Sequence, residues 1–236
     1  CFIGAEGTLG VVTRAVLRLR PAPAARATAL VALTTFDAAL ALLSRLQASF
    51  PGMVAAYELM WRDFVAASLS WQQLREPFEA AHPFVALIDV GGQEEGALQS
   101  QLEAVLGEAM EAGLALDAAI AQSHAQARAL WKIREATAVL PEHMPPPINF
   151  DVSLPLADIG RFADACRAAL TARWPAHHTV FFGHVGDGNL HLTTDSRTVN
   201  GEEAAVEALV YAQVAAFHGS VSAEHGIGLH KKPYLA

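Results

Sequence analysis

Two histidines stand on either side of a glycine-rich turn in the run from Phe182 to His191. The central Asp187-Gly188 pair is typical of a tight hairpin, and a symmetric turn there places His184 directly opposite His191 on one face of the hairpin. Directly opposed residues have Cβ atoms about 4.5–5.5 Å apart, so both imidazoles can reach one metal ion. The spacing therefore predicts a two-histidine metal site. Two hydrogen-bonded surface histidines are the simpler alternative.

A third ligand is expected from the dipeptide Glu224-His225, which is followed by glycines at positions 226 and 228. Adjacent residues in an extended segment point to opposite sides, so we do not expect both side chains to bind one ion unless the backbone bends. We assign Glu224 to the metal and His225 to proton transfer. The alternative is an exposed Glu-His pair at a glycine turn.

These motifs together resemble the C-terminal domain of the vanillyl-alcohol-oxidase flavoprotein superfamily, and within it the D-lactate, glycolate and D-2-hydroxyglutarate dehydrogenases. The resemblance rests on residues 183–191, 224–228 and 4–13 and spans essentially the whole chain. It implies an FAD-dependent D-2-hydroxyacid dehydrogenase whose flavin is held mainly by a domain outside this sequence. Residues 1–21 are then the C-terminal tail of that FAD-binding domain. Residues 22–236 are a substrate- and metal-binding cap domain, incomplete at its C-terminus.

Carried over position by position, the resemblance implies that a divalent metal, zinc or manganese, is held by His184, His191 and Glu224. It makes His225 the catalytic base. Arg134 matches the arginine that binds the substrate carboxylate, a role that suits a planar, bidentate guanidinium. An ordinary helix-surface cation is the alternative for Arg134. The residues expected against the flavin are Glu6, Gly7, Gly10 and Val11.

The sequence departs from the family pattern at three positions expected near the substrate. Asn149 stands where many members have lysine, Thr193 where the hydroxyglutarate branch has asparagine, and Ala138 where that branch has a small hydroxyl residue. The loss of a cation and of two polar groups argues against a dicarboxylate such as 2-hydroxyglutarate. The expected substrate is therefore a small 2-hydroxy acid, and the sequence does not identify which one.

Strand-like and helix-like segments alternate along the chain and must position these residues. The order predicts an α+β fold, an antiparallel sheet with helices on one face in a ferredoxin-like arrangement. The expected strands are 9–19, 27–33, 53–60, 84–90, 114–121 and 148–154, with a hairpin at 178–194. The expected helices are 36–50, 61–69, 94–112, 123–139, 156–174 and 202–217.

Composition restricts the partners of the chain. A net charge of -8 and a pI near 5.6 argue against nucleic acid as a partner. The most apolar stretch, 27–43, is interrupted by polar residues, so no transmembrane helix is expected. Two cysteines and no signal-peptide pattern favour the cytoplasm, with peripheral membrane contact only through an electron acceptor that the sequence does not identify. An exposed apolar face where the flavin domain would pack makes a homodimer an expected form.

Two other functions are compatible with the same residues. A metal-dependent hydrolase can also use two histidines and a glutamate, but the chain has no His-Glu-x-x-His helix, and the segment 4–13 would be unexplained. A non-enzymatic metal- or ligand-binding module describes what the chain does without a flavin domain. We expect this chain alone to hold no FAD and to turn over no substrate.

Overall fold

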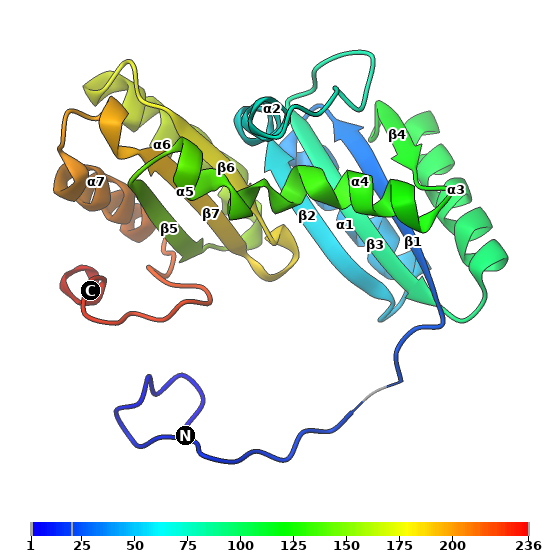
Figure 1. The fold of residues 1–236 in the computed structure, drawn as a ribbon, viewed down its shortest axis with the longest axis horizontal. Helices are drawn as coiled ribbons and strands as arrows, with labels where there is room; N and C mark the ends of the chain where they lie inside the picture. The colour runs from blue at the N-terminus through cyan, green and yellow to red at the C-terminus, as the bar shows by residue number, and fades with distance from the viewer. Residues whose placement is uncertain (1, 20, 236) are drawn as a thin grey trace.

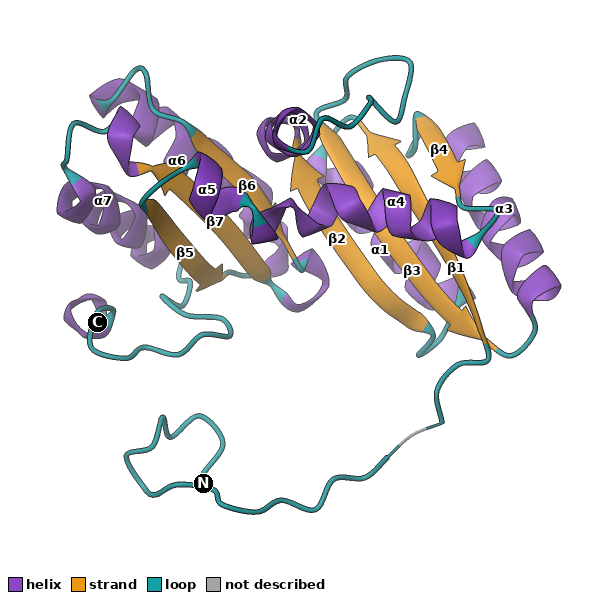
Figure 2. Cartoon of the chain, in the orientation of Figure 1, coloured by secondary structure: helices purple, strands orange, loops and turns teal. Residues whose placement is uncertain are grey.

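The computed structural model describes residues 2–19 and 21–235. Its strands form one seven-stranded sheet in which neighbouring strands pair antiparallel, in the order β4-β1-β3-β2-β6-β7-β5 (Figures 1 and 2). The strands are β1 (Ala25–Leu33), β2 (Val54–Trp61), β3 (Phe84–Gly92), β4 (Asp117–Ile120), β5 (Pro147–Ser153), β6 (Thr179–Gly183) and β7 (Asn189–Asp195). The helices are α1 (Phe36–Ser49), α2 (Arg62–Trp71), α3 (Glu95–Glu111), α4 (His124–Arg134), α5 (Leu140–His143), α6 (Ile159–Arg173) and α7 (Glu203–Ala216).

The first half of the sheet has the ferredoxin-like arrangement that the sequence predicts. Its strands lie in the order β4-β1-β3-β2, with α1 joining β1 to β2 and α3 joining β3 to β4. Helix α2 is an insertion between β2 and β3. The predicted α+β fold with an antiparallel sheet is therefore confirmed.

The placement of the helices differs in part from the prediction, because both faces of the sheet are covered. Helices α1, α3, α6 and α7 pack on one face, whereas α2, α4 and α5 pack on the other, where α4 crosses the first-half strands (Figure 1). In β1, the side chain of Val31 packs in the hydrophobic core on the α1/α3 face. Those of Leu30 and Ala32 pack in the separate core on the α2/α4 face. A strand buried on both faces has a continuous apolar run instead of an alternating one. The run 29–33 is such a signal.

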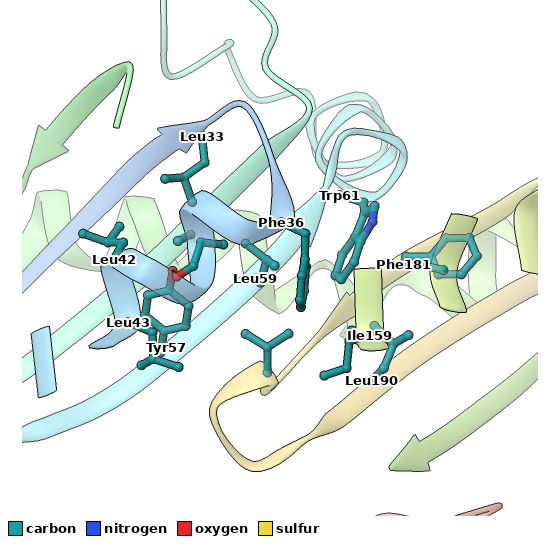
Figure 3. Packing of buried hydrophobic residues seen from close by; sticks show 14 of the residues in the cluster. Leu33, Phe36, Leu42, Leu43, Tyr57, Leu59, Trp61, Ile159, Phe181 and Leu190 are labelled. Carbon is teal, nitrogen blue, oxygen red and sulfur yellow. Dashed lines mark hydrogen bonds between the residues drawn. The ribbon is translucent and has the colours of Figure 1, made fainter. Parts of the chain in front are cut away.

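Aromatic packing joins the two halves where the sheet pairing is short. Strands β2 and β6 are paired through only two residue pairs, Leu59 with Gly183 and Met60 with Phe182. Beside them, Trp61 lies between the two halves, with its ring 5.9 Å from that of Phe36 and 6.3 Å from that of Phe181 (Figure 3). Apolar packing therefore continues from one half to the other, and it fixes β6 and β7 relative to β2.

The predicted helix over 123–139 is shorter than expected. A capping box begins the helix: Ser123 accepts a hydrogen bond from the Gln126 amide, and the Gln126 side chain accepts one from the amide of Gln122. After Arg134 the chain continues as a 3₁₀ turn over 135–138 and then as the short α5. Pro141 lies in the first turn of α5, where its missing N–H has no partner to lose.

The expected strand over 9–19 is wrong. The described residues of the segment 2–19, called the tail below, form no strand, and most of its side chains are exposed (Figure 1). A strand needs a neighbour for its backbone hydrogen bonds, and no described strand pairs with the tail. The division at 21/22 stays a prediction, and residues 1, 20 and 236 lie outside the described residues. Among the described helices, none is long and apolar enough to cross a membrane.

Candidate active site

A cavity of about 440 Å³ lies on the face of the sheet that α4 covers. Its walls come from the end of α4, from β5, β6 and β7, and from the segment that follows α7. The five residues predicted to carry the chemistry all line it: Arg134, His184, His191, Glu224 and His225.

The three predicted metal ligands form one cluster. Each of His184, His191 and Glu224 offers a ligand atom, and these atoms lie within 4.8 Å of one another. Two imidazole nitrogens and a carboxylate are a donor set that divalent zinc accepts, with a coordination position left for substrate. The residues present therefore fit a divalent metal.

The hairpin register that led to this prediction is nevertheless wrong. Phe182, and not His184, pairs with His191. The connection is longer than a two-residue turn, because residues 185–187 form a 3₁₀ turn and Gly188 follows with φ +83°. A Cβ on Gly188 would lie 2.8 Å from the carbonyl oxygen of Leu154, so both the turn and the packing require glycine. His184 reaches His191 from this connection, with ring centroids 5.4 Å apart.

Glu58 orients His184 and binds Arg134 at the same time. Its Oε1 lies 2.7 Å from Nδ1 of His184, and its Oε2 accepts a hydrogen bond of 2.8 Å from Nε of Arg134. Burial raises the pKa of Glu58, but the hydrogen bond from His184 and the charge of Arg134 outweigh it, so that the pKa stays below its ordinary value. The same hydrogen bond raises the pKa of His184. With Nδ1 engaged, Nε2 of His184 is the nitrogen left for a metal.

Arg134 is not a helix-surface cation. It lies at the end of α4, is buried, and places its guanidinium carbon 4.8 Å above the ring of Phe182. Its bond to Glu58 goes through Nε, which leaves the edge formed by the two terminal nitrogens for a bidentate pair with a carboxylate.

Asp151, on β5, holds the segment that carries the predicted third ligand, Glu224, and the predicted base, His225. Its Oδ2 accepts hydrogen bonds from the backbone amides of Glu224 (2.9 Å) and His225 (2.8 Å). Burial raises the pKa of Asp151, but these two amides outweigh it and lower that pKa. The chain turns at Gly226, with φ +79°. The two adjacent side chains therefore both line the cavity, through the backbone bend that an extended segment lacks.

His191 and His225 lie in different environments. Burial lowers the pKa of His191 to about 4, so its ring is neutral at pH 7, as a metal ligand must be. His225 is more exposed, and its ring lies 6.0 Å from that of His191 with an interplanar angle of 23°. Its Nδ1 is 3.7 Å from Oδ2 of Asp151. This nitrogen faces the carboxylate, and Nε2 is the nitrogen available for a proton.

Comparison with known proteins identifies the family. Residues 22–236 match the family described as "FAD linked oxidases, C-terminal domain". The chain belongs to this family.

Relatives of this FAD-linked oxidase domain cover nearly the whole chain. D-2-hydroxyglutarate dehydrogenase of Stutzerimonas stutzeri (strain A1501) is 33% identical over 99% of the chain and 51% of its own length. The mitochondrial D-2-hydroxyglutarate dehydrogenase of Rattus norvegicus is 32% identical over 99% of the chain and 43% of its own length. The chain thus spans about half the length of these curated relatives. A solved structure of alkyldihydroxyacetonephosphate synthase has the same fold, with a TM-score of 0.63 and 14% identity over 92% of this chain and 44% of that one.

The three departures from the family pattern lie in different places. Asn149 and Thr193 face each other across β5 and β7, with a hydrogen bond of 2.8 Å between Thr193 Oγ1 and Asn149 Oδ1, and both line the cavity. Ala138 is exposed and does not line it, whereas Thr137 does. The expectation for Ala138 assumed a continuous α-helix beyond Arg134. In the 3₁₀ turn that is present, residues three apart share a face. Thr137, three residues after Arg134, therefore lines the cavity in place of Ala138.

The four residues predicted to contact the flavin lie on the tail and are exposed: Glu6, Gly7, Gly10 and Val11. Gly7 has φ +77° and no atom within 4 Å of where its Cβ would be, so this turn leaves its backbone open to a flat ligand. Glu6 instead contacts the segment after Glu224, and Figure 1 shows the N-terminal turn beneath that segment. The assignment of these four residues to FAD stays a prediction.

Sequence reasoning missed Glu58 and Asp151. Both are carboxylates inside apolar strands, Glu58 between Tyr57 and Leu59 and Asp151 between Phe150 and Val152. A buried carboxylate needs a partner, so an acidic residue at such a position is a signal for a site. That signal could have identified both.

Proposed function

We propose that this chain is the substrate- and metal-binding part of an FAD-dependent D-2-hydroxyacid dehydrogenase, which oxidises a 2-hydroxy acid to the 2-oxoacid. The observation that carries the proposal is the cavity, because it brings the His184–His191–Glu224 cluster, Arg134 and His225 together in a member of the FAD-linked oxidase family. The names of the relatives support the class of reaction. Family membership argues against the hydrolase and against a module without enzymatic activity.

Arg134 binds and orients the substrate. Its terminal nitrogens pair with the carboxylate, while Glu58 and the ring of Phe182 hold the guanidinium in place. His184, His191 and Glu224 hold the divalent metal, zinc or manganese, which would act as a Lewis acid that lowers the pKa of the substrate hydroxyl. FAD, held mainly by a domain outside this chain, would accept the hydride from the substrate carbon.

His225 takes the hydroxyl proton at Nε2, while its Nδ1 faces the carboxylate of Asp151. The substrate loses this proton and a hydride from Cα, and the hydroxyl becomes the 2-oxo group. Asp151 also holds the backbone of His225, so that the base stays beside His191. Closure of the cavity by the flavin domain would exclude water from the reacting groups.

The substrate is a small 2-hydroxy acid with one carboxylate. Each cation that lines the cavity has an acidic neighbour, since Arg134 is bonded to Glu58 and Lys231 lies 3.9 Å from the carboxylate of Asp151. Neither offers an uncompensated charge to a second carboxylate. The wall of the same cavity also includes the neutral Asn149 and Thr193. A substrate with an uncharged side chain fits such a wall, although the relatives named above are 2-hydroxyglutarate dehydrogenases.

The test uses the flavin-loaded protein that carries this chain and its flavin domain. Loss of the flavin absorption band is followed without oxygen after mixing with D-lactate, glycolate, D-2-hydroxybutyrate, D-malate or D-2-hydroxyglutarate. The monocarboxylates should reduce the flavin, with kcat/KM at least about tenfold above the dicarboxylates, the scale of about 1.4 kcal/mol. No reduction by any acid would refute the function. Faster reduction by dicarboxylates would refute only the substrate class.

A further inference from the structure

The tail contacts the C-terminal loop (residues 222–228) through a carboxylate. The side chain of Glu6 accepts hydrogen bonds from the backbone amides of Ile227 (2.6 Å) and Gly228 (2.9 Å), which lie 221 and 222 residues away in the sequence. The amides of Gly228 and Ile227 also lower the pKa of Glu6, so the carboxylate is ionised in the contact at pH 7.

The C-terminal loop is shaped to receive this carboxylate. Gly226 and Gly228 have φ angles of +79° and +55°, the left-handed conformation that glycine adopts without strain. Such glycines turn successive amides toward one side and form a concave anion site in the backbone. A Cβ on Gly226 would lie 3.1–3.3 Å from three atoms of the Glu6 carboxyl group. The close approach therefore requires glycine.

The tail in turn presents Glu6 from an ordered turn. The amide and hydroxyl of Thr8 both donate to the carbonyl oxygen of Ala5, at 2.9 and 2.6 Å, and the amide of Ala5 donates to the carbonyl of Phe2. Glu6 itself has φ +46°, a strained value for a residue with a side chain. The backbone of Glu6 is therefore strained in this turn. The two hydrogen bonds that the Glu6 carboxylate accepts from Ile227 and Gly228 offset that strain.

A second carboxylate holds the other end of the same loop. Asp151 accepts from the amides of Glu224 and His225, on the N-terminal side of Gly226, and Glu6 accepts from the amides on its C-terminal side. One carboxylate belongs to β5 of the sheet and the other to the tail. Glu224 and His225 therefore lie on a segment that is fixed from both sides.

We propose that Glu6 is a positioning residue that couples the tail to the C-terminal loop and thereby aligns His225 for proton transfer. This rests on the proposed function, in which the tail leads to the flavin domain and His225 is the base. The placement of the flavin domain and the alignment of the base then depend on the same pair of backbone hydrogen bonds. Loss of Glu6 leaves His184, His191 and Arg134 in place, because they lie outside the C-terminal loop, and it loosens the C-terminal side of the loop that carries Glu224 and the base.

The first arm of the test measures the contact in this chain, without flavin or metal. Residue-resolved amide hydrogen exchange is compared for the wild type, Glu6→Ala, Glu6→Gln and the control Glu111→Ala, an exposed acid at the end of α3. The amides of Ile227 and Gly228 should exchange at least tenfold faster in Glu6→Ala, with Glu6→Gln between the two. Amides of β3 should be unchanged, which shows that the chain is folded. Equal exchange at 227 and 228 in wild type and Glu6→Ala overturns the proposal.

The second arm uses the flavin-loaded enzyme and separates positioning from structural support. When wild type and variants are compared at equal metal content, Glu6→Ala should lower the limiting rate of flavin reduction at least tenfold, with FAD content and substrate Kd unchanged, and Glu6→Gln should restore part of that rate. An unchanged rate, or a loss that only follows lost FAD, overturns the proposal. If no 2-hydroxy acid reduces the wild-type enzyme, the proposed function fails and the catalytic role of Glu6 with it, while the exchange arm still decides the contact.

Discussion

Nδ1 of His184 lies 2.7 Å from Oε1 of Glu58, and this carboxylate is almost completely buried. A carboxylate that fixes one imidazole nitrogen makes the other a better metal ligand, because it sets the orientation of the ring and raises its basicity. Since Glu58 also binds Arg134, one buried side chain positions a residue of the proposed metal site and the proposed substrate clamp. A substitution at Glu58 should therefore affect both proposed functions, metal binding through His184 and substrate binding through Arg134.

Glu58→Gln should weaken zinc binding by about 10–100-fold, the usual effect of losing an outer-shell partner of a metal-bound histidine. Titration calorimetry with zinc measures it, and circular dichroism at the same temperature checks that the variant is folded. Glu108→Gln is the matched control, because Glu108 forms an exposed pair with Arg45. A zinc Kd within threefold of wild type in the Glu58 variant would show that this carboxylate does not orient His184.

His191→Ala should abolish stoichiometric binding of zinc or manganese. The substitution removes one of three clustered ligands and leaves His184 and Glu224, which cannot hold the ion as a three-ligand site does. Elemental analysis after dialysis measures the metal content. His124→Ala, at an exposed histidine at the start of α4, should keep the wild-type content. The same content in His191→Ala as in the control would remove His191 from the ligand set.

The grouping of the five candidate residues around one cavity could be predicted, because side-chain chemistry restricts which residues are candidates, whereas their geometry could not. His184 and His191 were expected together, and they are together, but the register that suggested it was two residues off at His184. Turn length depends on local backbone conformation and on contacts such as that of Gly188 with Leu154, which the sequence pattern does not contain. The sequence predicts that Ala138 lines the cavity, but Thr137 does so instead, for a similar reason. After Arg134 the α-helix becomes a 3₁₀ turn, and this shifts by one residue the position that faces the cavity.

The long-range contacts were missed for a different reason. The sequence assigns Arg134 to the substrate carboxylate but does not predict its protein partner, Glu58, which is 76 residues away on β2. Asp151 and the amides it binds are separated by 73 and 74 residues. The first pair depends on where α4 crosses the sheet (Figure 1), and the second depends on the bridge between Ser153 and Ser220 that brings the segment after α7 to β5. A single sequence determines neither. The ferredoxin-like half was predictable because its elements alternate regularly.

His225→Asn in the flavin-loaded enzyme should slow flavin reduction by substrate by at least about a hundredfold, the scale of a lost general base. Metal content should stay near the wild-type value, because His225 is outside the ligand cluster. Rapid mixing followed by absorption measures the reduction, and elemental analysis measures the metal. His218→Asn, at a histidine that lines no part of the cavity, is the control. A reduction rate near that of the control would exclude His225 as the base.

Asn149→Lys should increase activity toward dicarboxylates. Asn149 is exposed where it lines the cavity and pairs with Thr193, so a lysine can enter there without burying its charge. Its ammonium would meet a second carboxylate that Arg134, already bonded to Glu58, does not reach. We expect kcat/KM for D-2-hydroxyglutarate to rise at least about tenfold relative to D-lactate, about 1.4 kcal/mol of preference.

Asn149→Leu is the matched control for that gain, because it removes the hydrogen bond to Thr193 without adding a charge. It should leave the ratio of the two kcat/KM values within about threefold of wild type. If Asn149→Leu raises the ratio as much as Asn149→Lys does, loss of the Asn149–Thr193 contact and not the charge is the cause. If neither variant changes it, the far end of the substrate lies elsewhere in the cavity, beyond the reach of position 149.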